Sequence, residues 1–286
     1  MSHPPRIDLH CHSSASDGLL SPRDLVLRAR ANGVDVLALT DHDEVAGLAE
    51  ASQAARECAI VFVDGVEVSV TWGGITIHVV GLRIDPSHVG LNQGLGAVRA
   101  SRIARARRIA RALDGAGIAG SLEGALAYAA NPNLISRTHF ARFLVEKGCA
   151  SDVRTVFQRY LVSGAPGHVP HRWAALADAV GWIRSSGGTA VIAHPGRYKL
   201  NGEQMRVLLG EFRDLGGEGI EVVTGNYSPQ QAADFGRLAL EFGLLASRGS
   251  DFHGPGESRV DLGKMPALAA DLKPVWHDWE CVAAHV

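Results

Sequence analysis

The segment RIDLHCHSSASDG (residues 6–18) begins like a buried β-strand and continues as a run of polar, ionisable side chains. Asp8, His10 and His12 are two residues apart, so on an extended chain their side chains share one face. Asp17 follows in the same segment. A lone histidine at a strand end is usually a structural residue, but burying several imidazoles and carboxylates together is costly unless cations compensate them. We therefore interpret this strand end as part of a metal site.

The composition is typical of a globular chain with one large α/β domain or two small ones. The sequence has 286 residues, of which 46% are hydrophobic, and this is enough to bury a core. Its 28 Lys and Arg residues against 30 Asp and Glu residues give a net charge of -2. This balance excludes a global basic field, so an anionic partner must be bound by a local cationic or metallic site.

The sequence also bears on the compartment. It contains no run of about 18 consecutive apolar residues, and its first residues lack the apolar run of a signal peptide. The cysteines are scattered without a C-x-x-C spacing, at Cys11, Cys58, Cys149 and Cys281. We expect a cytoplasmic protein with reduced thiols, no membrane association and no obligate protein partner. Cys11 is expected to point away from the neighbouring histidines as a buried apolar residue.

Short β-branched runs alternate with helical patterns along most of the chain, which predicts repeated β-α units and a parallel sheet. The predicted strands cover residues 6–10, 34–43, 60–70, 75–82, 189–195, 219–225 and 244–254. The predicted helices between them cover residues 21–33, 45–59, 202–216 and 228–243. Gly73 and Gly74 close a predicted hairpin, which returns His78 to the side of the preceding strand. About seven strands predict a closed or nearly closed β/α barrel.

Residues 85–188 interrupt this alternation, because they contain helical patterns and no convincing strand. The first helical stretch carries many arginines, at Arg99, Arg102, Arg105, Arg107, Arg108 and Arg111. The isoleucines and alanines between them favour an amphipathic helix with a solvated basic face over a nucleic-acid patch. We therefore predict a barrel domain over residues 1–84 and 189–286, and a helical insertion over residues 85–188 that forms a substrate-binding lid.

Nine residues with metal-binding side chains lie in or beside the predicted strands. They are His10, His12, Asp17, His42, Glu67, His78, His194, Asp251 and His253. The carboxyl ends of barrel strands meet at one rim, so we expect these sequence-distant residues to converge. Nine candidates exceed the needs of one tetrahedral ion and match two or three divalent ions. The imidazole and carboxylate set suits Mn²⁺, Fe²⁺ or Zn²⁺, and Glu67 is the predicted bridging ligand.

Six motifs, taken in order, resemble those of the PHP (polymerase and histidinol phosphatase) family of metal-dependent phosphoesterases, which is related to the amidohydrolases. The motifs are DLHCHSSASDG (8–18), LALTDHDEVAG (37–47), GVEVSV (65–70), IHVVGL (77–82), IAHPGR (192–197) and GSDFHG (249–254). The resemblance implies a distorted (β/α)7 barrel and a trinuclear manganese-type site formed by the nine residues. Together with LISRTHFAR (134–142), the motifs are most similar to the branch of 3′,5′-nucleoside bisphosphate phosphatases and 5′-to-3′ exonucleases.

By this resemblance we expect a phosphomonoesterase that removes the 3′-phosphate of nucleoside 3′,5′-bisphosphates. Exonuclease action on short single-stranded oligonucleotides is expected as an accompanying activity. The expected catalytic residues are Glu67, Asp17, His42 and His253. Glu67 would bridge two ions at the point of attack, and a third ion beside the other three residues would polarise the phosphoryl oxygens.

Recognition of a second phosphate requires cations outside the metal cluster. A predicted helix start supplies polar side chains for this role, at Ser136, Arg137, Thr138 and His139. A helix cap and a surface arginine would explain the same residues without a ligand. Arg197 and Asn226 follow strand ends and are candidates for phosphate or sugar contacts. Asp43 would accept a hydrogen bond from a ribose hydroxyl or would orient His42.

Two alternatives remain open at this point. A phosphatase for another small phosphate ester, such as histidinol phosphate, would use the same metal chemistry. A non-catalytic module that holds metal or binds oligonucleotides, like the PHP modules attached to polymerases, belongs to a different class. The complete ligand set argues against the second alternative.

Overall fold

The computed structural model describes residues 5–225 and 227–283, and its centre is a seven-stranded sheet whose strands follow the order of the sequence. The strands are β1 (Ile7–Asp8), β2 (Val36–Leu39), β3 (Val61–Trp72), β4 (Ile75–Leu82), β5 (Thr189–Ile192), β6 (Gly219–Thr224) and β7 (Leu245–Gly249). All neighbouring pairs are parallel except those that β4 makes with β3 and β5. The predicted α/β architecture is confirmed, with one reversed strand.

The sheet closes on itself between its first and last strands. The Leu9 N–H donates to the Arg248 carbonyl at 3.1 Å, and Cys11 forms a parallel bridge with Phe252. Closure brings the segment after β1 beside the segment after β7, so residues from the two ends of the chain meet at one rim. The result is a distorted seven-stranded barrel, as predicted.

The β3–β4 hairpin forms because Gly73 and Gly74 both adopt positive φ, which the tight turn requires. Its register pairs Ser69 with His78. The hairpin therefore returns the chain to the rim, as expected from the sequence, and supplies His78 from a strand that runs opposite to its neighbours.

Helices cover the outside of the barrel. They are α1 (Pro22–Ala31), α2 (Leu48–Glu57), α7 (Leu176–Ser185), α8 (Gly202–Asp214) and α9 (Pro229–Phe242). The predicted start of α1 is confirmed, because Pro22 is its first residue and the Ser21 side chain accepts a hydrogen bond from the Asp24 N–H. No helix in the described part of the chain is both long enough and apolar enough to cross a membrane.

The barrel interior holds a second apolar cluster, distinct from the layer between strands and helices. Strand residues such as Ile7, Ala38 and Val191 pack there against Val275 and Trp279 from the segment that leads to α10 (Glu280–Ala283). The strands and this segment together fill this part of the barrel with apolar side chains, which leaves the polar rim as the place for a site.

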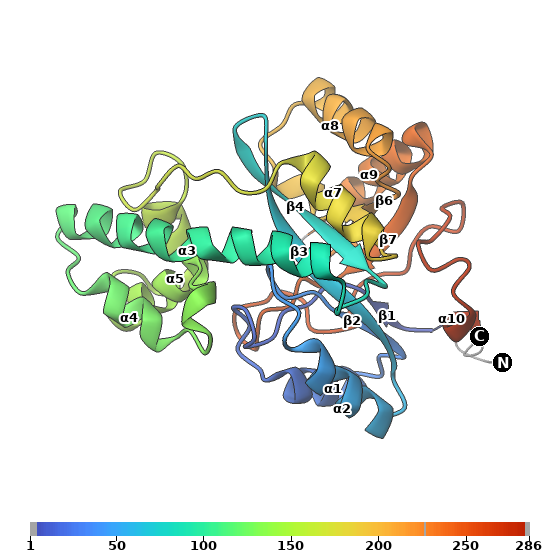
Figure 1. Ribbon diagram of the computed structural model, residues 1–286, viewed down its shortest axis with the longest axis horizontal. Helices are drawn as coiled ribbons and strands as arrows, with labels where there is room; N and C mark the ends of the chain where they lie inside the picture. The colour runs from blue at the N-terminus through green and yellow to red at the C-terminus, as the bar shows by residue number, and fades with distance from the viewer. Residues whose placement is uncertain (1–4, 226, 284–286) are drawn as a thin grey trace.

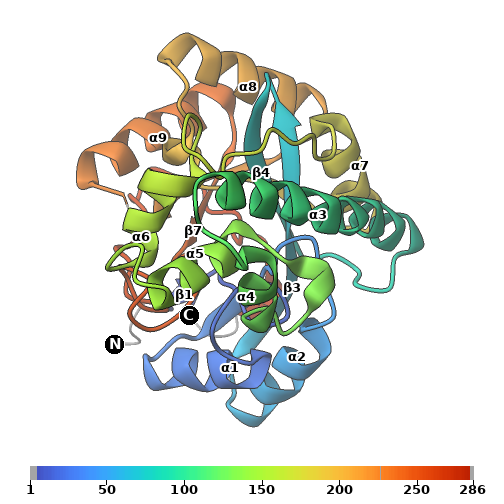
Figure 2. The ribbon, with the colours of Figure 1, turned by 90° about the vertical axis from the view of Figure 1, so that its left-hand side faces the viewer.

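The segment between β4 and β5 contains no strand among its described residues. It contains α3 (Val89–Gly115), α4 (Ser121–Ala127), a 3-10 turn (Pro132–Leu134), α5 (Arg137–Glu146), α6 (Val153–Val156), a π-helical turn (Phe157–Leu161) and α7. Figure 2 shows α4, α5 and α6 in front of the end of the barrel.

The part of this segment with a core of its own is narrower than residues 85–188. Leu91 and Leu95 at the start of α3, together with the apolar face of α7, join the main barrel core. The separate core contains residues between Ala106 and Leu161. The long α3 helix therefore contributes to both cores, with Leu91 and Leu95 near its start and the residues from Ala106 to Leu113 near its end. Its middle part belongs to neither core.

The separate helical core should depend on Leu144, which is fully buried in α5. We expect Leu144→Ala to lower the free energy of unfolding by about 2–5 kcal/mol, because the substitution leaves a cavity. Leu27 on α1, 42% exposed, provides a matched control, since Leu27→Ala should change stability by about 0.5 kcal/mol or less. Urea unfolding followed by circular dichroism measures both free energies, and equal losses of stability would contradict the burial of Leu144 in a separate core.

Candidate metal centre

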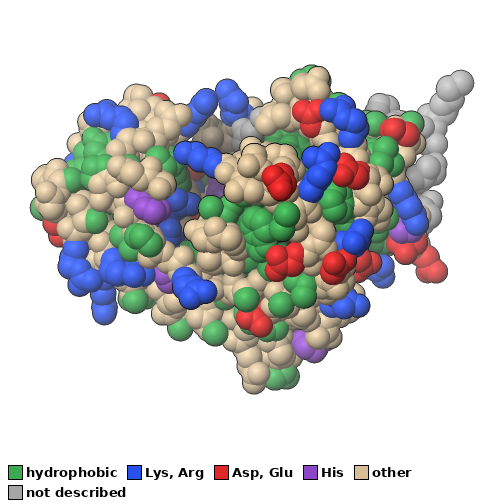
Figure 3. Space-filling model, turned by 90° about the horizontal axis from the view of Figure 1, so that it is seen from above, with side chains coloured by type: hydrophobic (Ala, Val, Ile, Leu, Met, Phe, Trp, Pro, Cys, Tyr) green, Lys and Arg blue, Asp and Glu red, His purple; other side chains and the backbone are tan. Residues whose placement is uncertain are grey.

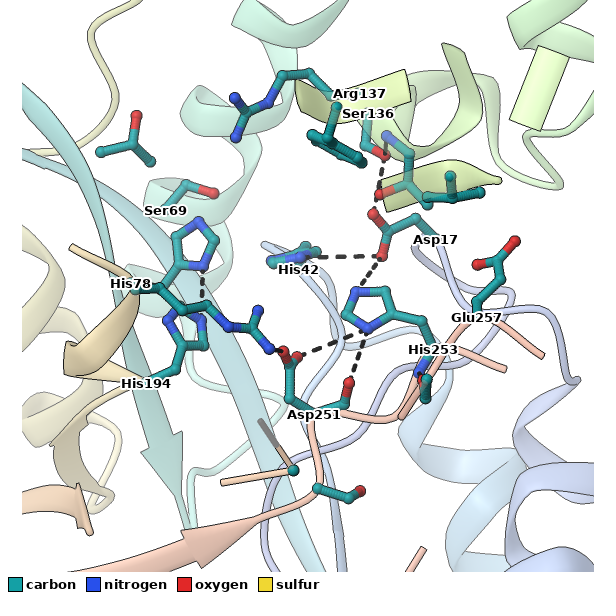
Figure 4. Close-up of a pocket in the computed structure, with 18 of the residues that line it drawn as sticks. Asp17, His42, Ser69, His78, Ser136, Arg137, His194, Asp251, His253 and Glu257 are labelled. Atoms are coloured by element: carbon teal, nitrogen blue, oxygen red, sulfur yellow. Dashed lines mark hydrogen bonds and ion pairs between the residues drawn. The ribbon is translucent and has the colours of Figure 1, made fainter. Parts of the chain in front are cut away.

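The nine predicted metal-binding residues converge at the rim of the barrel, and they form four overlapping groups. The groups are His12, Asp17, His42 and His253; His10, Glu67 and His194; His10, His12 and Asp251; and His42, Glu67 and His78. Within each group the potential ligand atoms lie within 4.8 Å of one another. Figure 4 shows six of these residues around one pocket.

Glu67 lies at the centre of the cluster and is fully buried. Its Oε1 lies 2.9 Å from His78 Nδ1 and 2.9 Å from His194 Nε2, and its Oε2 lies 2.8 Å from His42 Nδ1. Burial alone would raise the pKa of this carboxyl, but the surrounding imidazoles, His78 and His42 first, hold the pKa well below its usual range. Glu67 is therefore a carboxylate, placed between His78 in β4 and the histidines that follow β2 and β5.

His10 is oriented by a residue that the sequence analysis missed. Its Nδ1 lies 2.8 Å from Glu221 Oε1, to which it donates a hydrogen bond. The second carboxylate oxygen of Glu221 accepts a hydrogen bond from the backbone N–H of His194 at 2.6 Å. The other ring nitrogen, Nε2, faces Glu67 Oε1 at 3.3 Å, on the side where a metal ion would bind. A carboxylate in the middle of the apolar strand GIEVVTG (219–225) was the signal that could have revealed Glu221.

Asp17 is held by the helical segment between β4 and β5. The Ser136 hydroxyl donates to Asp17 Oδ2 at 2.9 Å, and Arg142 donates to the Asp17 carbonyl at 2.7 Å while it pairs with Glu257. Figure 4 shows Asp17 between Ser136 on one side and the rings of His42 and His253 on the other. The insertion therefore positions a candidate ligand as well as lying over the pocket.

The backbone is strained at the rim. Among non-glycine residues, His194 (φ 28°), Asp251 (φ 53°) and Asp43 (φ 52°) adopt left-handed conformations. Such conformations cost of order 1–3 kcal/mol each and are concentrated at functional sites. At Gly249, by contrast, a side chain is excluded, because a Cβ atom would lie 2.1 Å from the Cβ of His10.

Asp8 does not share the direction of His10 and His12, contrary to the prediction. Its carboxylate accepts hydrogen bonds from the backbone N–H groups of Ser250 (2.8 Å) and Gly263 (2.9 Å). The strand β1 ends at Asp8, so the alternation of an extended chain does not continue to the histidines. Cys11 is buried in the core as predicted, and its thiol donates to the Ala38 carbonyl.

The cluster fits divalent cations on the chemistry of its atoms. Asp17 Oδ1 and Glu67 Oε2 are buried and accept no hydrogen bond from any described residue. The ring nitrogens of His10 and His12 face each other at 3.2 Å. Burial, with the charges of His253 and His42, lowers the pKa of His12 to about 3, so its imidazole is a neutral ligand at pH 7. Buried ligand atoms that lie this close to one another suit divalent cations bound between them.

A pocket of about 290 Å³ opens above the cluster, and its wall contains several arginines. They are Arg102, Arg105, Arg137, Arg197 and Arg259. Figure 3 shows a hollow between the helical segment, at the left, and the rest of the molecule. The pocket therefore joins a metal-binding base to a cationic wall.

Arg102 and Arg105 overturn the expectation of a wholly solvated basic face on α3. They are only 4% and 8% exposed, and neither Nε has a hydrogen-bond partner among the described residues. Burial, with the nearby charges of Arg137 and Arg102, lowers the pKa of Arg105 well below its usual value. Both arginines occupy the buried face of α3, where the helix passes from one apolar core to the other. The position of these arginines on the apolar face of the helix is the sequence feature that indicates their burial.

The carboxylate of Asp43 is not placed to accept a ribose hydroxyl, nor does it contact His42. It accepts hydrogen bonds from the Ser69 N–H (2.7 Å) and hydroxyl (2.9 Å), and it pairs with Arg102. Asp43 is fully buried, so its observed contacts hold Arg102 in the pocket wall.

The other predicted substrate contacts divide into three cases. Ser136, Arg137 and Thr138 line the pocket at the start of α5, and Arg197 lines it while paired with Asp251. His139 is buried outside the lining, where its Nδ1 accepts the Ser136 N–H at 3.0 Å as part of a capping box. The predicted contact at Asn226 lies outside the described residues.

The role of Glu221 can be tested through metal affinity. We expect Glu221→Gln to weaken binding of Mn²⁺ about 10- to 100-fold, because the amide no longer fixes the His10 ring as a carboxylate does. Glu218→Gln is a matched control, since Glu218 precedes the same strand and is exposed. Isothermal titration calorimetry of the metal-free variants gives the affinities, and an unchanged affinity in Glu221→Gln would refute this role.

Comparisons with known proteins agree with this geometry. The chain is 50% identical over 274 residues (96% of each chain) to the 3′,5′-nucleoside bisphosphate phosphatase of Chromobacterium violaceum. It is 43% identical over 271 residues (95% of this chain, 98% of the relative) to a 5′-3′ exoribonuclease of Haemophilus influenzae. A solved amidohydrolase structure from Chromobacterium violaceum, with bound sulfate and no metal, matches with a TM-score of 0.93 and 49% identity, covering 98% of this chain and 96% of the other. Residues 8–215 match the PHP domain family. The chain therefore belongs to the PHP domain family.

Proposed function

We propose that this protein is a metal-dependent phosphatase that removes the 3′-phosphate from nucleoside 3′,5′-bisphosphates. The single observation that carries the proposal is that the pocket combines two separate sites suited to bind negatively charged groups. Its base holds the cluster of metal-binding residues, and its wall holds the arginines of α3 and α5. A substrate with two phosphates matches this arrangement. The bisphosphate phosphatase from Chromobacterium violaceum, at 50% identity, supports the same assignment.

The metal-binding residues would hold two or three divalent ions, and we favour Mn²⁺ because the donors are imidazole and carboxylate groups without thiolate. Such ions, when bound, neutralise a phosphate ester, lower the pKa of water and align the attacking and leaving oxygens. Glu67 would bridge neighbouring ions, since its two oxygens face different histidines. Asp17, His42 and His253 would complete the catalytic set on the side of the insertion.

The second phosphate would lie against Arg102, Arg105 and Arg137. Two buried donor atoms of this wall, Arg102 Nε and Arg105 Nε, lack a partner among the described residues, and so does the nearby Trp173 Nε1. The charge of Arg105 is not balanced by a carboxylate of any described residue. A phosphate dianion would satisfy these donors and offset the repulsion between the arginines. The helical segment would therefore act as the substrate-binding lid.

The arginine wall also discriminates between phosphate esters. Histidinol phosphate carries a protonated amine, which the arginines would repel, whereas a second phosphate would be attracted. An exonuclease activity is a second candidate function, because the 5′-3′ exoribonuclease of Haemophilus influenzae is 43% identical over nearly the whole chain. A non-catalytic role would not explain why one pocket combines metal-binding residues with a cationic wall.

A phosphate-release assay separates these candidates. With Mn²⁺ present, we expect kcat/KM for adenosine 3′,5′-bisphosphate to exceed that for histidinol phosphate by 10-fold or more. This ratio corresponds to the loss of about one charge-assisted hydrogen bond. Glu67→Ala controls for contaminating phosphatases, because it should abolish turnover while the circular dichroism spectrum stays unchanged. Turnover that survives in the metal-loaded Glu67→Ala protein would contradict the bridging role. A higher kcat/KM for histidinol phosphate would overturn the substrate assignment.

The second-phosphate contact can be tested at Arg137. We expect Arg137→Ala to lower kcat/KM for adenosine 3′,5′-bisphosphate about 10- to 100-fold and to leave hydrolysis of a simple aryl phosphate nearly unchanged. Arg154→Ala is the matched control, since Arg154 is an exposed arginine of the same helical segment. An equal loss on both substrates would refute specific recognition by Arg137.

A further inference from the structure

The arginines of α3 recur at every third position, at Arg99, Arg102, Arg105, Arg108 and Arg111. On an α-helix, residues three apart form a continuous ridge that is inclined to the helix axis. We call this row the arginine ridge. Arg102 and Arg105 are buried in the pocket wall, whereas Arg108 and Arg111 are exposed. The arginine ridge therefore leads from the pocket to the outer surface.

Two aromatic side chains beside the pocket connect the exposed and buried parts of the ridge. Arg108 Nη2 donates to His171 Nδ1 at 3.1 Å, and the His171 ring packs edge-on against Trp173 with centroids 4.1 Å apart. Trp173 lines the pocket, and the guanidinium of Arg105 lies 5.0 Å from its ring centroid. Arg108 is therefore linked to the buried part of the ridge through two aromatic rings.

The charge of the molecule is divided between its two parts. Residues 85–188 contain 13 Lys and Arg against 6 Asp and Glu, a net charge of +7, while the rest of the chain has 15 against 24, a net charge of -9. Figure 3 shows Lys and Arg gathered with few acidic groups at the left-hand end, where the helical segment lies, and mixed charges elsewhere. A polyanion that approaches the pocket would be attracted along the helical segment and repelled by the barrel.

We infer that the exposed end of the arginine ridge, Arg108 and Arg111, binds the backbone phosphates of a single-stranded nucleic acid whose terminal nucleotide occupies the pocket. This inference rests on the proposed function. Continuity with a phosphate-binding wall favours a chain of phosphates over an acidic protein segment, because the same chain would enter the pocket. Contacts to phosphates carry no base information, so binding should be independent of sequence. His171 and Trp173 provide aromatic surface beside the ridge, as single-strand binding sites commonly do.

The test compares two double variants of the full-length protein. Arg108→Gln/Arg111→Gln removes the exposed end of the ridge, and Arg30→Gln/Arg213→Gln removes the same charge from exposed positions on the barrel helices α1 and α8. Binding of a fluorescent, 5′-phosphorylated uridine hexanucleotide is measured by anisotropy between 50 and 200 mM salt, in a Glu67→Ala background that leaves the strand intact. Turnover of adenosine 3′,5′-bisphosphate is measured with Glu67 restored.

We expect the ridge variant to bind the hexanucleotide more weakly and to reduce the slope of log Kd against log salt by about 1.4, two single-strand phosphate contacts at about 0.7 each. Its kcat/KM for the bisphosphate should stay within about twofold of the parent, and the barrel variant should match the parent in both assays. An adenosine hexanucleotide should respond as the uridine strand does. These results would support the inference.

Other outcomes would overturn it. An unchanged salt slope, an equal loss in the barrel variant, or displacement of the strand by polyglutamate at the same charge concentration would refute nucleic-acid binding by the ridge. A parallel loss of bisphosphate turnover would show that the substitutions disturb the pocket instead. If the parent protein binds the strand through the ridge but releases no phosphate from the bisphosphate, the proposed function fails while the ridge inference stands.

Discussion

The burial of several imidazoles and carboxylates around Glu67 is the constraint on which the rest of this structure depends. Glu67 lies between His42, His78 and His194 with both oxygens in contact with imidazole nitrogens. Burying such a cluster is costly, and divalent cations bound between its ligand atoms would offset the cost. The order of the sheet, its closure between β1 and β7, and the reversed strand β4 bring these residues together from separate parts of the chain.

The helical segment buries positive charge, whereas the rim of the barrel buries carboxylates. Arg102 and Arg105 are buried where α3 crosses from the barrel core to its own core, and Asp43 compensates the charge of Arg102. Unpaired cations in a pocket wall are as costly as unpaired carboxylates, so an anionic ligand would stabilise them. The segment also reaches the metal-binding residues, because Ser136 donates to Asp17. The start of α5 therefore lines the pocket and also holds a candidate metal ligand.

Sequence patterns predicted the elements well where local chemistry determines them. The Ser21 cap, the glycine turn at Gly73 and Gly74, and the alternation of strands and helices all depend on neighbours in the chain. The prediction that Asp8 points in the same direction as the histidines was wrong. The strand β1 ends at Asp8, and backbone N–H groups from distant segments donate hydrogen bonds to its carboxylate. Glu221 was missed because its partner, His10, is far away in the sequence.

The sequence by itself determined the candidate residues, a set of imidazoles and carboxylates in or beside the strands, and the high arginine content of one helix. It could do so because strand ends and helix periodicity are local properties. Only the tertiary structure decided which face of that helix is buried. The same arginines are solvated or enclosed according to the two cores that α3 joins, and this long-range packing is not encoded in the spacing of neighbouring residues.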